Sequence, residues 1–192
     1  KVHDRIERVI REYEEEGHLE EIDLVRAERV AWSGAGVELD DETLSRLTMM
    51  VQQAWWEGIL LPAGVFDILD ELRSRGLKVG VCSNAPYRPE SLHGQLRHLG
   101  LDRIFDSVTF SSEVGWRKPS PKLFHAALNA LGTAPERTVM VGDRCREDIR
   151  GALEMNMGTI RTRQHVDDTC QDVEADAVID SLDELLRVLF WW

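Results

Sequence analysis

Polar residues that could act on a phosphate group follow three short apolar runs of the sequence. Ser83 and Asn84 follow VGVC, and Lys118 comes a short loop after SVTF. Asp143 follows TVMV and a glycine, and Asp148 comes five residues later. Enzymes that transfer phosphoryl groups work mostly by positioning and charge stabilisation: a hydroxyl donates a hydrogen bond, a lysine supplies positive charge, and a carboxylate holds Mg²⁺. The three groups together favour phosphoryl-transfer chemistry.

Each of these residues also has a purely structural interpretation when it is considered alone. Ser83 and Asn84 are common turn or cap formers, and a lysine in a loop, such as Lys118, is usually a solvated charge. Asp143 could cap the next helix, and Asp148 could lie in its first turn and interact with the helix dipole. The functional interpretation depends on their order, since each group follows a successive apolar run.

The elements that must position these groups alternate between helix and strand from Pro62 onward. This alternation with short connections predicts a Rossmann-like, open parallel sheet with helices on both faces. Ligands bind at the carboxyl ends of the strands in such sheets, so the three groups should meet at one edge. The pattern predicts strands at 77–82, 107–110, 138–141, 158–161 and 177–179, and helices at 65–76, 92–100, 121–131, 147–156 and 182–189.

The first 60 residues contain helical patterns only. Apolar spacing predicts helices from Val2 to about Gly17, from Leu19 to about Ser33, and from Asp40 or Asp41 to about residue 58. The chain therefore divides into a helical part, residues 1–60, and an α/β part, residues 61–192.

Charge and cysteine content exclude several other classes of protein. The 192 residues include 35 acidic and 23 basic side chains, a net charge of −12, which disfavours binding to nucleic acid or to an anionic membrane. Cys82, Cys145 and Cys170 form no CxxC pair, so we expect neither a disulfide framework nor a thiolate metal site. No apolar run approaches the roughly 20 residues of a membrane helix, and no charged leader is present. We therefore expect a cytoplasmic protein.

From Pro62 to about Arg163, the sequence resembles the haloacid dehalogenase (HAD) superfamily of hydrolases. The matching segments are LLPAGVFDILDELRSRGLKVGVCSNA (60–85), FSSEVGWRKPSPKLFHAALNALG (110–132) and TVMVGDRCREDIRGALEMNMGTI (138–160). The family's second motif is a strand ending in Ser or Thr, and its third is a Lys commonly followed by Pro. Its fourth is Gly-Asp with a second acid a few residues on. The helical residues 1–60 resemble the small cap that one branch inserts between the first and second motifs.

The resemblance implies a role for each matching residue. Ser83 would bind the phosphoryl oxygens with the Asn84 backbone beside it, and Lys118 would neutralise the nucleophile and the phosphoryl group. Asp143 would ligate Mg²⁺, and Asp148 would either support the metal shell or orient Lys118. The expected catalytic residues are thus Ser83, Lys118 and Asp143, the substrate-binding residues are Ser83, Asn84 and Lys118, and the metal ligands are Asp143 and Asp148.

The family's first motif, an apolar strand ending in Asp-x-Asp, is not found in this sequence. It carries the aspartate that attacks phosphorus and the one that acts as acid and base. The nearest match, LDDET (39–43), has no apolar strand before it and is interpreted as a helix cap. Because the family's motif precedes the cap and residue 1 is Lys, we expect the nucleophile before Lys1 and an inactive fragment. The alternative is a natural loss of the nucleophile.

Several functions are compatible with these residues. The first is a Mg²⁺-dependent phosphatase that hydrolyses a small phosphorylated metabolite through an aspartyl-phosphate, as a monomer or homodimer. A 2-haloacid dehalogenase would need no metal and generally lacks the Gly-Asp of residues 142–143. A phosphomutase or a non-catalytic binding protein of the same fold are further alternatives. The aromatic tail Phe190-Trp191-Trp192 packs on the core, joins a partner or marks a truncation.

Overall fold

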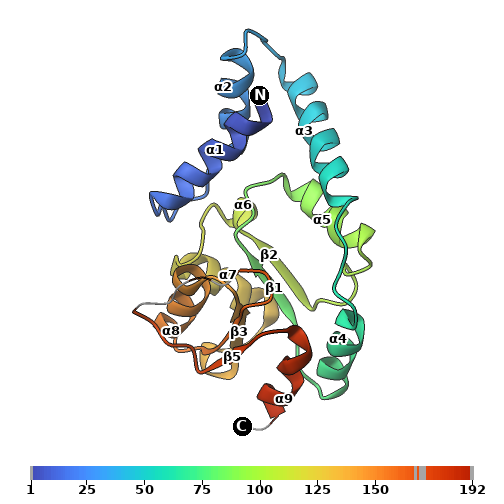
Figure 1. Ribbon diagram of the computed structural model, residues 1–192, viewed down its shortest axis with the longest axis vertical. Coiled ribbons are helices and arrows are strands. Elements are labelled where there is room, and N and C mark those ends of the chain that lie inside the picture. The colour runs from blue at the N-terminus through green and yellow to red at the C-terminus, as the bar shows by residue number, and fades with distance from the viewer. Residues whose placement is uncertain (1, 167, 169–171, 191–192) are drawn as a thin grey trace.

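Three long helices lie at one end of the computed structural model and the parallel strands lie at the other (Figure 1). The structure describes residues 2–166, 168 and 172–190. The helices are α1 (Val2–Glu15), α2 (Leu24–Ser33) and α3 (Asp41–Trp56). α1 packs against α2, and α3 packs against α5 (Pro89–His98). The helices predicted within the first 60 residues are present.

The second helix begins five residues later than its hydrophobic pattern predicts, at Leu24 rather than Leu19. Asp23 caps it by accepting a hydrogen bond from a backbone N–H in the first turn. The preceding residues use their backbone groups elsewhere, because Glu20 forms an isolated antiparallel bridge with Trp116. A distant contact that the local pattern does not contain therefore delays the start of the helix.

The rest of the chain alternates between strand and helix, as predicted. The predicted helix at 147–156 is instead a π-helix, η2, followed by the short α8, and α6 was not predicted. The elements are α4 (Val65–Ser74), β1 (Gly80–Ser83), α5, β2 (Ser107–Phe110), α6 (Ser111–Val114), α7 (Pro121–Leu131), η1 (Pro135–Arg137), β3 (Val139–Gly142), η2 (Cys145–Arg150), α8 (Gly151–Glu154), β4 (Gly158–Thr162), β5 (Ala177–Ile179), η3 (Leu182–Glu184) and α9 (Leu185–Phe190).

The strands are parallel, but they form two separate sheets. β1 pairs with β2, and the other sheet has the order β3-β4-β5. Within the described residues, β1 and β3 each have one edge that no strand pairs with. The expected α/β class and the parallel direction of the strands are confirmed, and the strands are divided between these two sheets.

Helices on both faces hold the two sheets together. On one face, α4 and α9 belong to an apolar cluster that includes Val79, next to β1, and Val141 of β3. On the other, α7 and α8 pack with Cys82 of β1 and Met140 of β3. Met140 and Val141 can face different clusters because successive strand side chains point to opposite faces. The sheets are thus joined by side-chain packing.

The aromatic tail packs on the core as far as the structure describes it. Phe190 joins the apolar cluster of α4 and α9, and the guanidinium carbon of Arg75 lies 3.8 Å from the centroid of its ring. Trp191 and Trp192 lie outside the described residues. Core packing is therefore the interpretation that holds for Phe190.

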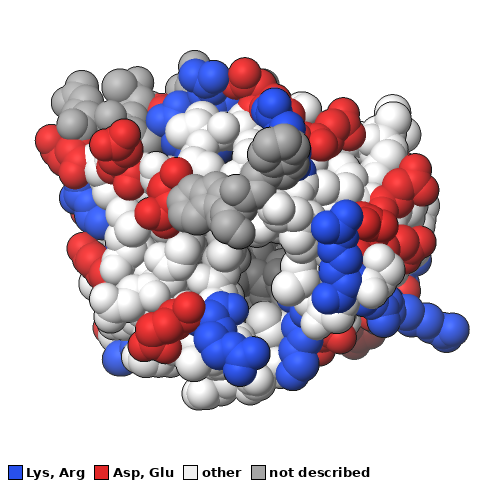
Figure 2. Space-filling view, turned by 90° about the horizontal axis from the view of Figure 1, so that it is seen from below, with Lys and Arg blue, Asp and Glu red and all other residues white. Residues whose placement is uncertain are grey.

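The end of the molecule that carries α9 has a surface of mixed charge (Figure 2). Basic and acidic side chains are interspersed on this face, and no continuous basic area crosses it. Single-sign basic areas are what non-specific nucleic-acid binding requires. This face offers none.

Candidate active site

The Lys118 side chain connects the loops that follow three different strands. It is 9% exposed, and its Nζ donates a hydrogen bond of 2.8 Å to the backbone oxygen of Cys82, at the end of β1. The same nitrogen lies 2.6 Å from Oδ1 of Asp148, in the segment after β3. Lys118 itself follows β2. The fold thus brings together the three chain segments that the sequence analysis singled out.

Asp148 holds this arrangement with both of its carboxylate oxygens. Oδ1 pairs with Lys118, and Oδ2 accepts hydrogen bonds from the backbone N–H groups of Asp143 (3.1 Å) and Arg144 (3.0 Å). The residue is only 4% exposed. Of the two roles expected for Asp148, orientation of Lys118 is the one that its contacts favour.

The glycine at position 142 leaves the space that the Asp148 side chain occupies. A Cβ atom at Gly142 would lie 2.4 Å from the carboxyl carbon of Asp148, which is closer than real Cβ contacts come. The Gly-Asp pair at the end of β3 therefore has a packing cause: without the glycine, the acid that orients Lys118 could not reach its place.

The Asn84 side chain fixes the backbone of Lys118. Its Oδ1 accepts a hydrogen bond from the Lys118 N–H (2.7 Å), and its Nδ2 donates one to the Lys118 carbonyl (3.2 Å). The peptide bond from Lys118 to Pro119 is cis. The amide of Asn84 is thus used for positioning, and only its backbone is left for the substrate role that was expected.

Ser83 and Asp143 lie next to this network with their side chains unused. Ser83 ends β1, and Asp143 directly follows β3; both are partly buried. In the part of the chain that the structure describes, neither the Ser83 hydroxyl nor the Asp143 carboxylate has a hydrogen-bond or ion-pair partner. A hydroxyl donor and a hard oxygen ligand are therefore available beside a buried ammonium group.

Metal ligation at this edge would depend on Asp143. Among the described residues, no group of three or more His, Cys, Asp and Glu side chains could hold a metal ion. Mg²⁺ does not need such a group, since it retains several waters and is usually bound by one or two carboxylates together with substrate phosphate oxygens. The unpartnered Asp143 carboxylate fits an ion held in that way.

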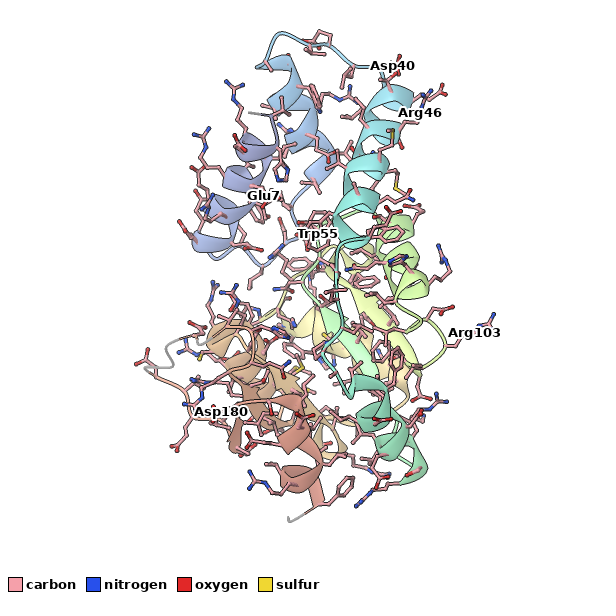
Figure 3. All side chains as sticks on the ribbon, turned by 45° about the vertical axis from the view of Figure 1, so that its right-hand side comes forward. Glu7, Asp40, Arg46, Trp55, Arg103 and Asp180 are labelled. Atoms are coloured by element: carbon pink, nitrogen blue, oxygen red, sulfur yellow. The ribbon has the colours of Figure 1, made fainter. Side chains whose placement is uncertain are left out.

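The paired aspartates of LDDET lie far from this site. Asp40 caps α3, its Oδ1 accepting a 2.7 Å hydrogen bond from the Thr43 N–H, as the sequence predicts. Figure 3 shows Asp40 and Arg46 near the end of α3 that points away from the strands, and Trp55 near the end closest to them. The pair cannot supply a nucleophile at the sheet edge.

Comparison with known proteins identifies the family. Residues 2–156 match the family of haloacid dehalogenase-like hydrolases. The chain belongs to this family. Among HAD hydrolases of known structure, a HAD phosphatase from Thermococcus onnurineus superposes with a TM-score of 0.66 over 98% of this chain and 86% of its own, at 23% identity.

Two relatives that are named as phosphatases have higher sequence identity to the chain over shorter segments. A glyceraldehyde 3-phosphate phosphatase of Methanothermobacter thermautotrophicus is 37% identical over 129 residues, which are 63% of this chain and 55% of that protein. A phosphoserine phosphatase of Thermus thermophilus is 44% identical over 84 residues, 44% of this chain and 33% of that protein. The chain thus spans about half or less of the length of these relatives.

One further residue of this hydrogen-bond network was missed from the sequence. Ser111 is fully buried at the start of α6, directly after β2, and its Oγ accepts a 2.7 Å hydrogen bond from the Ala85 N–H in the loop after β1. It joins the two loops that carry Asn84 and Lys118. The available signal was a hydroxyl directly after the apolar run SVTF, the same signal that selected Ser83.

The expectation about cysteines is wrong for Cys145, which is disulfide-bonded. The fold brings Cys145 against a distant segment, where its backbone N–H donates a 2.9 Å hydrogen bond to Asp168, and spacing along the chain does not show such a contact. Cys170 lies outside the described residues. Cys82 is a free thiol whose pKa is raised by burial, so it is a poor nucleophile near neutral pH.

Proposed function

We propose that this HAD-family chain forms the phosphate-binding and metal-binding part of a phosphatase that hydrolyses a small phosphorylated metabolite. The observation that carries the proposal is the buried Lys118 ammonium, held between Cys82 and Asp148 beside the unpartnered Ser83 hydroxyl and Asp143 carboxylate. Two relatives that are named as phosphatases of small phosphorylated metabolites support the substrate class. The proposed domains are the cap, residues 1–60, and the core, residues 61–192.

The residues of the chain supply positioning and charge in this mechanism. The Ser83 hydroxyl donates a hydrogen bond to a phosphoryl oxygen, with the Asn84 backbone beside it. Lys118 neutralises the charge that the phosphoryl oxygens and an attacking carboxylate bring together. Asp148 holds the Lys118 ammonium and the Asn84 side chain holds the Lys118 backbone before substrate arrives, so little reorganisation is needed when the reaction occurs.

Asp143 is the proposed ligand of Mg²⁺, which when bound would offset negative charge on the phosphoryl group. The sequence also suggested Asp148 as a ligand. Because both Asp148 oxygens already contact Lys118 and backbone N–H groups, we propose that it acts on Lys118.

The nucleophile is proposed to come from a strand that lies between β1 and β3. Both strands have an unpaired edge within the described residues, and helices on both faces contact both of them. A parallel strand between them would end at the edge where Lys118 lies. An aspartate at its end would carry out the attack on phosphorus that no residue described here is placed to perform.

The test is hydrolysis of p-nitrophenyl phosphate by the full-length product of the gene, with and without Mg²⁺. We expect Mg²⁺-dependent phosphate release, and Asp143→Asn should lower turnover by about 100-fold and weaken the response to Mg²⁺. Glu147→Gln is the matched control, because Glu147 follows Asp143 by four residues in η2 and lies 3.9 Å from Nη1 of Arg146 rather than against Lys118 or Asp148. A wild-type rate in Asp143→Asn contradicts the assignment.

Two alternatives predict different outcomes in the same experiment. Metal-independent chloride release from 2-chloropropionate would favour a dehalogenase. Inertness of the full-length protein in both assays would favour a binding protein.

We propose a small-molecule substrate and no nucleic-acid or membrane partner. The net charge of −12 and the mixed charges in Figure 2 support this. Over the described residues, no helix combines the length and the apolar character needed to cross a bilayer.

A further inference from the structure

The linker between α1 and α2 is hydrogen-bonded to the residues that directly precede Lys118. The Arg117 N–H donates to the Leu19 carbonyl (2.8 Å), and the Glu21 N–H donates to the Gly115 carbonyl (3.0 Å). The bridge between Glu20 and Trp116 lies between these two bonds. The helical part of the molecule therefore contacts the α/β part at the chain segment that directly precedes Lys118.

The buried Arg117 guanidinium forms ion pairs with two glutamates on the helical side of this contact. Its side chain is 6% exposed; Nη1 lies 2.6 Å from Oε1 of Glu21, whose side chain is 4% exposed, and Nη2 pairs with Glu14 in the last turn of α1. A planar guanidinium can bind two carboxylates at once, which a lysine cannot do with the same geometry. We call Arg117 with Glu14 and Glu21 the clasp.

A second contact holds the same linker on the loop that carries Asp143. Arg146 donates from Nη2 to the Gly17 carbonyl (2.9 Å). A Cβ at Gly17 would lie 2.7 Å from that nitrogen, so the guanidinium packs directly on the linker backbone. The linker is therefore fastened to the loops after both β2 and β3.

We infer that Arg117 is a positioning residue that couples docking of the helices to the place of the Lys118 ammonium. The two residues are adjacent, and their side chains have separate sets of partners. Arg117 reaches the clasp, while Lys118 reaches Cys82 and Asp148. If the helices undock, Arg117 loses its partners, and the peptide bond between Arg117 and Lys118 is then held only from the Lys118 side. The inference rests on the proposed function only in assigning phosphate to the Lys118 site.

The test uses the full-length protein and two readouts that need no turnover. The first is the distance between spin labels at Val30→Cys and Arg103→Cys, both exposed in the described structure (66% for Val30; 94% for the Arg103 side chain), measured by pulsed electron paramagnetic resonance. The second is the dissociation constant of inorganic phosphate, measured by calorimetry. Arg117→Gln should broaden the distance distribution and weaken phosphate binding by about tenfold, as expected for displacing one charged hydrogen-bond donor.

Glu14→Gln is a milder variant for two reasons. The Glu14 side chain is 44% exposed, and Arg117 keeps its ion pair with Glu21 when the Glu14 charge is removed. It should shift both readouts in the same direction by a smaller amount. Arg46→Gln, on α3 far from the strands, is the control and should change neither. Lower thermal stability with unchanged phosphate affinity would mean that Arg117 is merely structural.

The outcomes separate the inference from the proposed function. Correlated changes in distance and phosphate affinity support the coupling, even if the wild-type protein hydrolyses nothing. A change in only one of the two readouts overturns it, as does a wild-type protein that binds no phosphate. Turnover that Arg117→Gln leaves unaltered would keep the phosphatase proposal and reject the coupling.

Discussion

Two buried carboxylates, one in each part of the molecule, have opposite surroundings. Asp148 in the core is 4% exposed and contacts a lysine and two backbone N–H groups. Glu28 in α2 is 7% exposed, and its carboxylate accepts a 2.6 Å hydrogen bond from the Thr48 hydroxyl. Burial raises the pKa of Glu28 above its usual value; the Thr48 hydrogen bond and Arg88 partly oppose this shift. The partners of Asp148 thus stabilise a buried charge, whereas the surroundings of Glu28 disfavour the charged form of its carboxyl group.

The variant with the largest expected effect is Lys118→Ala, which tests whether Asp148 needs its cation. Turnover by the full-length protein should fall by 100-fold or more, roughly the effect of losing one preorganised charge. The change also removes the cation from Asp148, so the free energy of unfolding should drop by about 3 kcal/mol.

Chemical denaturation measures that drop, and the matched control is the double variant Lys118→Met with Asp148→Asn. The double variant should recover much of the stability and none of the activity. Equal stability losses in the single and double variants would show that Asp148 does not need its cation.

A smaller effect is expected from Gly142→Ala, which crowds the carboxyl group of Asp148 without changing any charge. The new methyl group overlaps that carboxyl at 2.4 Å, so either the strand end or Asp148 must move. Overpacking of this kind costs about 1–3 kcal/mol.

We expect turnover to fall with stability in Gly142→Ala, because Lys118 loses its orienting partner. Gly58→Ala is the control, since the nearest atom to a Cβ there is a backbone oxygen at 3.5 Å. Unchanged turnover in Gly142→Ala would separate Asp148 from the site.

The smallest effect concerns Glu28→Gln, which should stabilise the protein by about 1 kcal/mol at pH 7. A carboxyl whose pKa is raised in the folded state binds its proton more tightly there than in the unfolded chain. Wild-type stability should therefore fall as pH rises from the unfolded pKa of Glu28 through its folded pKa.

Thermal melting from pH 4 to pH 8 measures this difference, and the variant should lose that part of the pH dependence. Glu42→Gln, at an exposed position in the first turn of α3, is the control. A destabilised Glu28→Gln at pH 7 would mean that Glu28 is held as a charge after all.

The sequence predicted those parts of the fold that local patterns determine. Helical spacing located α1, α3, α4, α5 and α7. The order of polar residues after three apolar runs also anticipated that their chain segments meet, as the contacts of Lys118 with Cys82 and Asp148 show. The Asp40 cap was predictable because capping uses residues only three apart.

Long-range contacts account for what the sequence did not predict. The late start of α2 depends on Trp116, and the use of the Asn84 side chain depends on Lys118, 34 residues away. The disulfide of Cys145 and the buried Ser111 likewise depend on segments that meet only in the folded chain. No spacing rule contains such information.

The division between β1 and β3 has a consequence for the chain when it is produced by itself. Within the described residues, β1 and β3 each have an edge that no strand pairs with, and such edges are ready templates for hydrogen bonding to another polypeptide. Residues 1–192 alone should therefore self-associate through the edges of β1 and β3. The amide protons on these edges should exchange with deuterium as fast as those on the outer edges of β2 and β5. A strand added between β1 and β3 would pair with both edges, and their amide protons should then exchange more slowly than those elsewhere in the molecule.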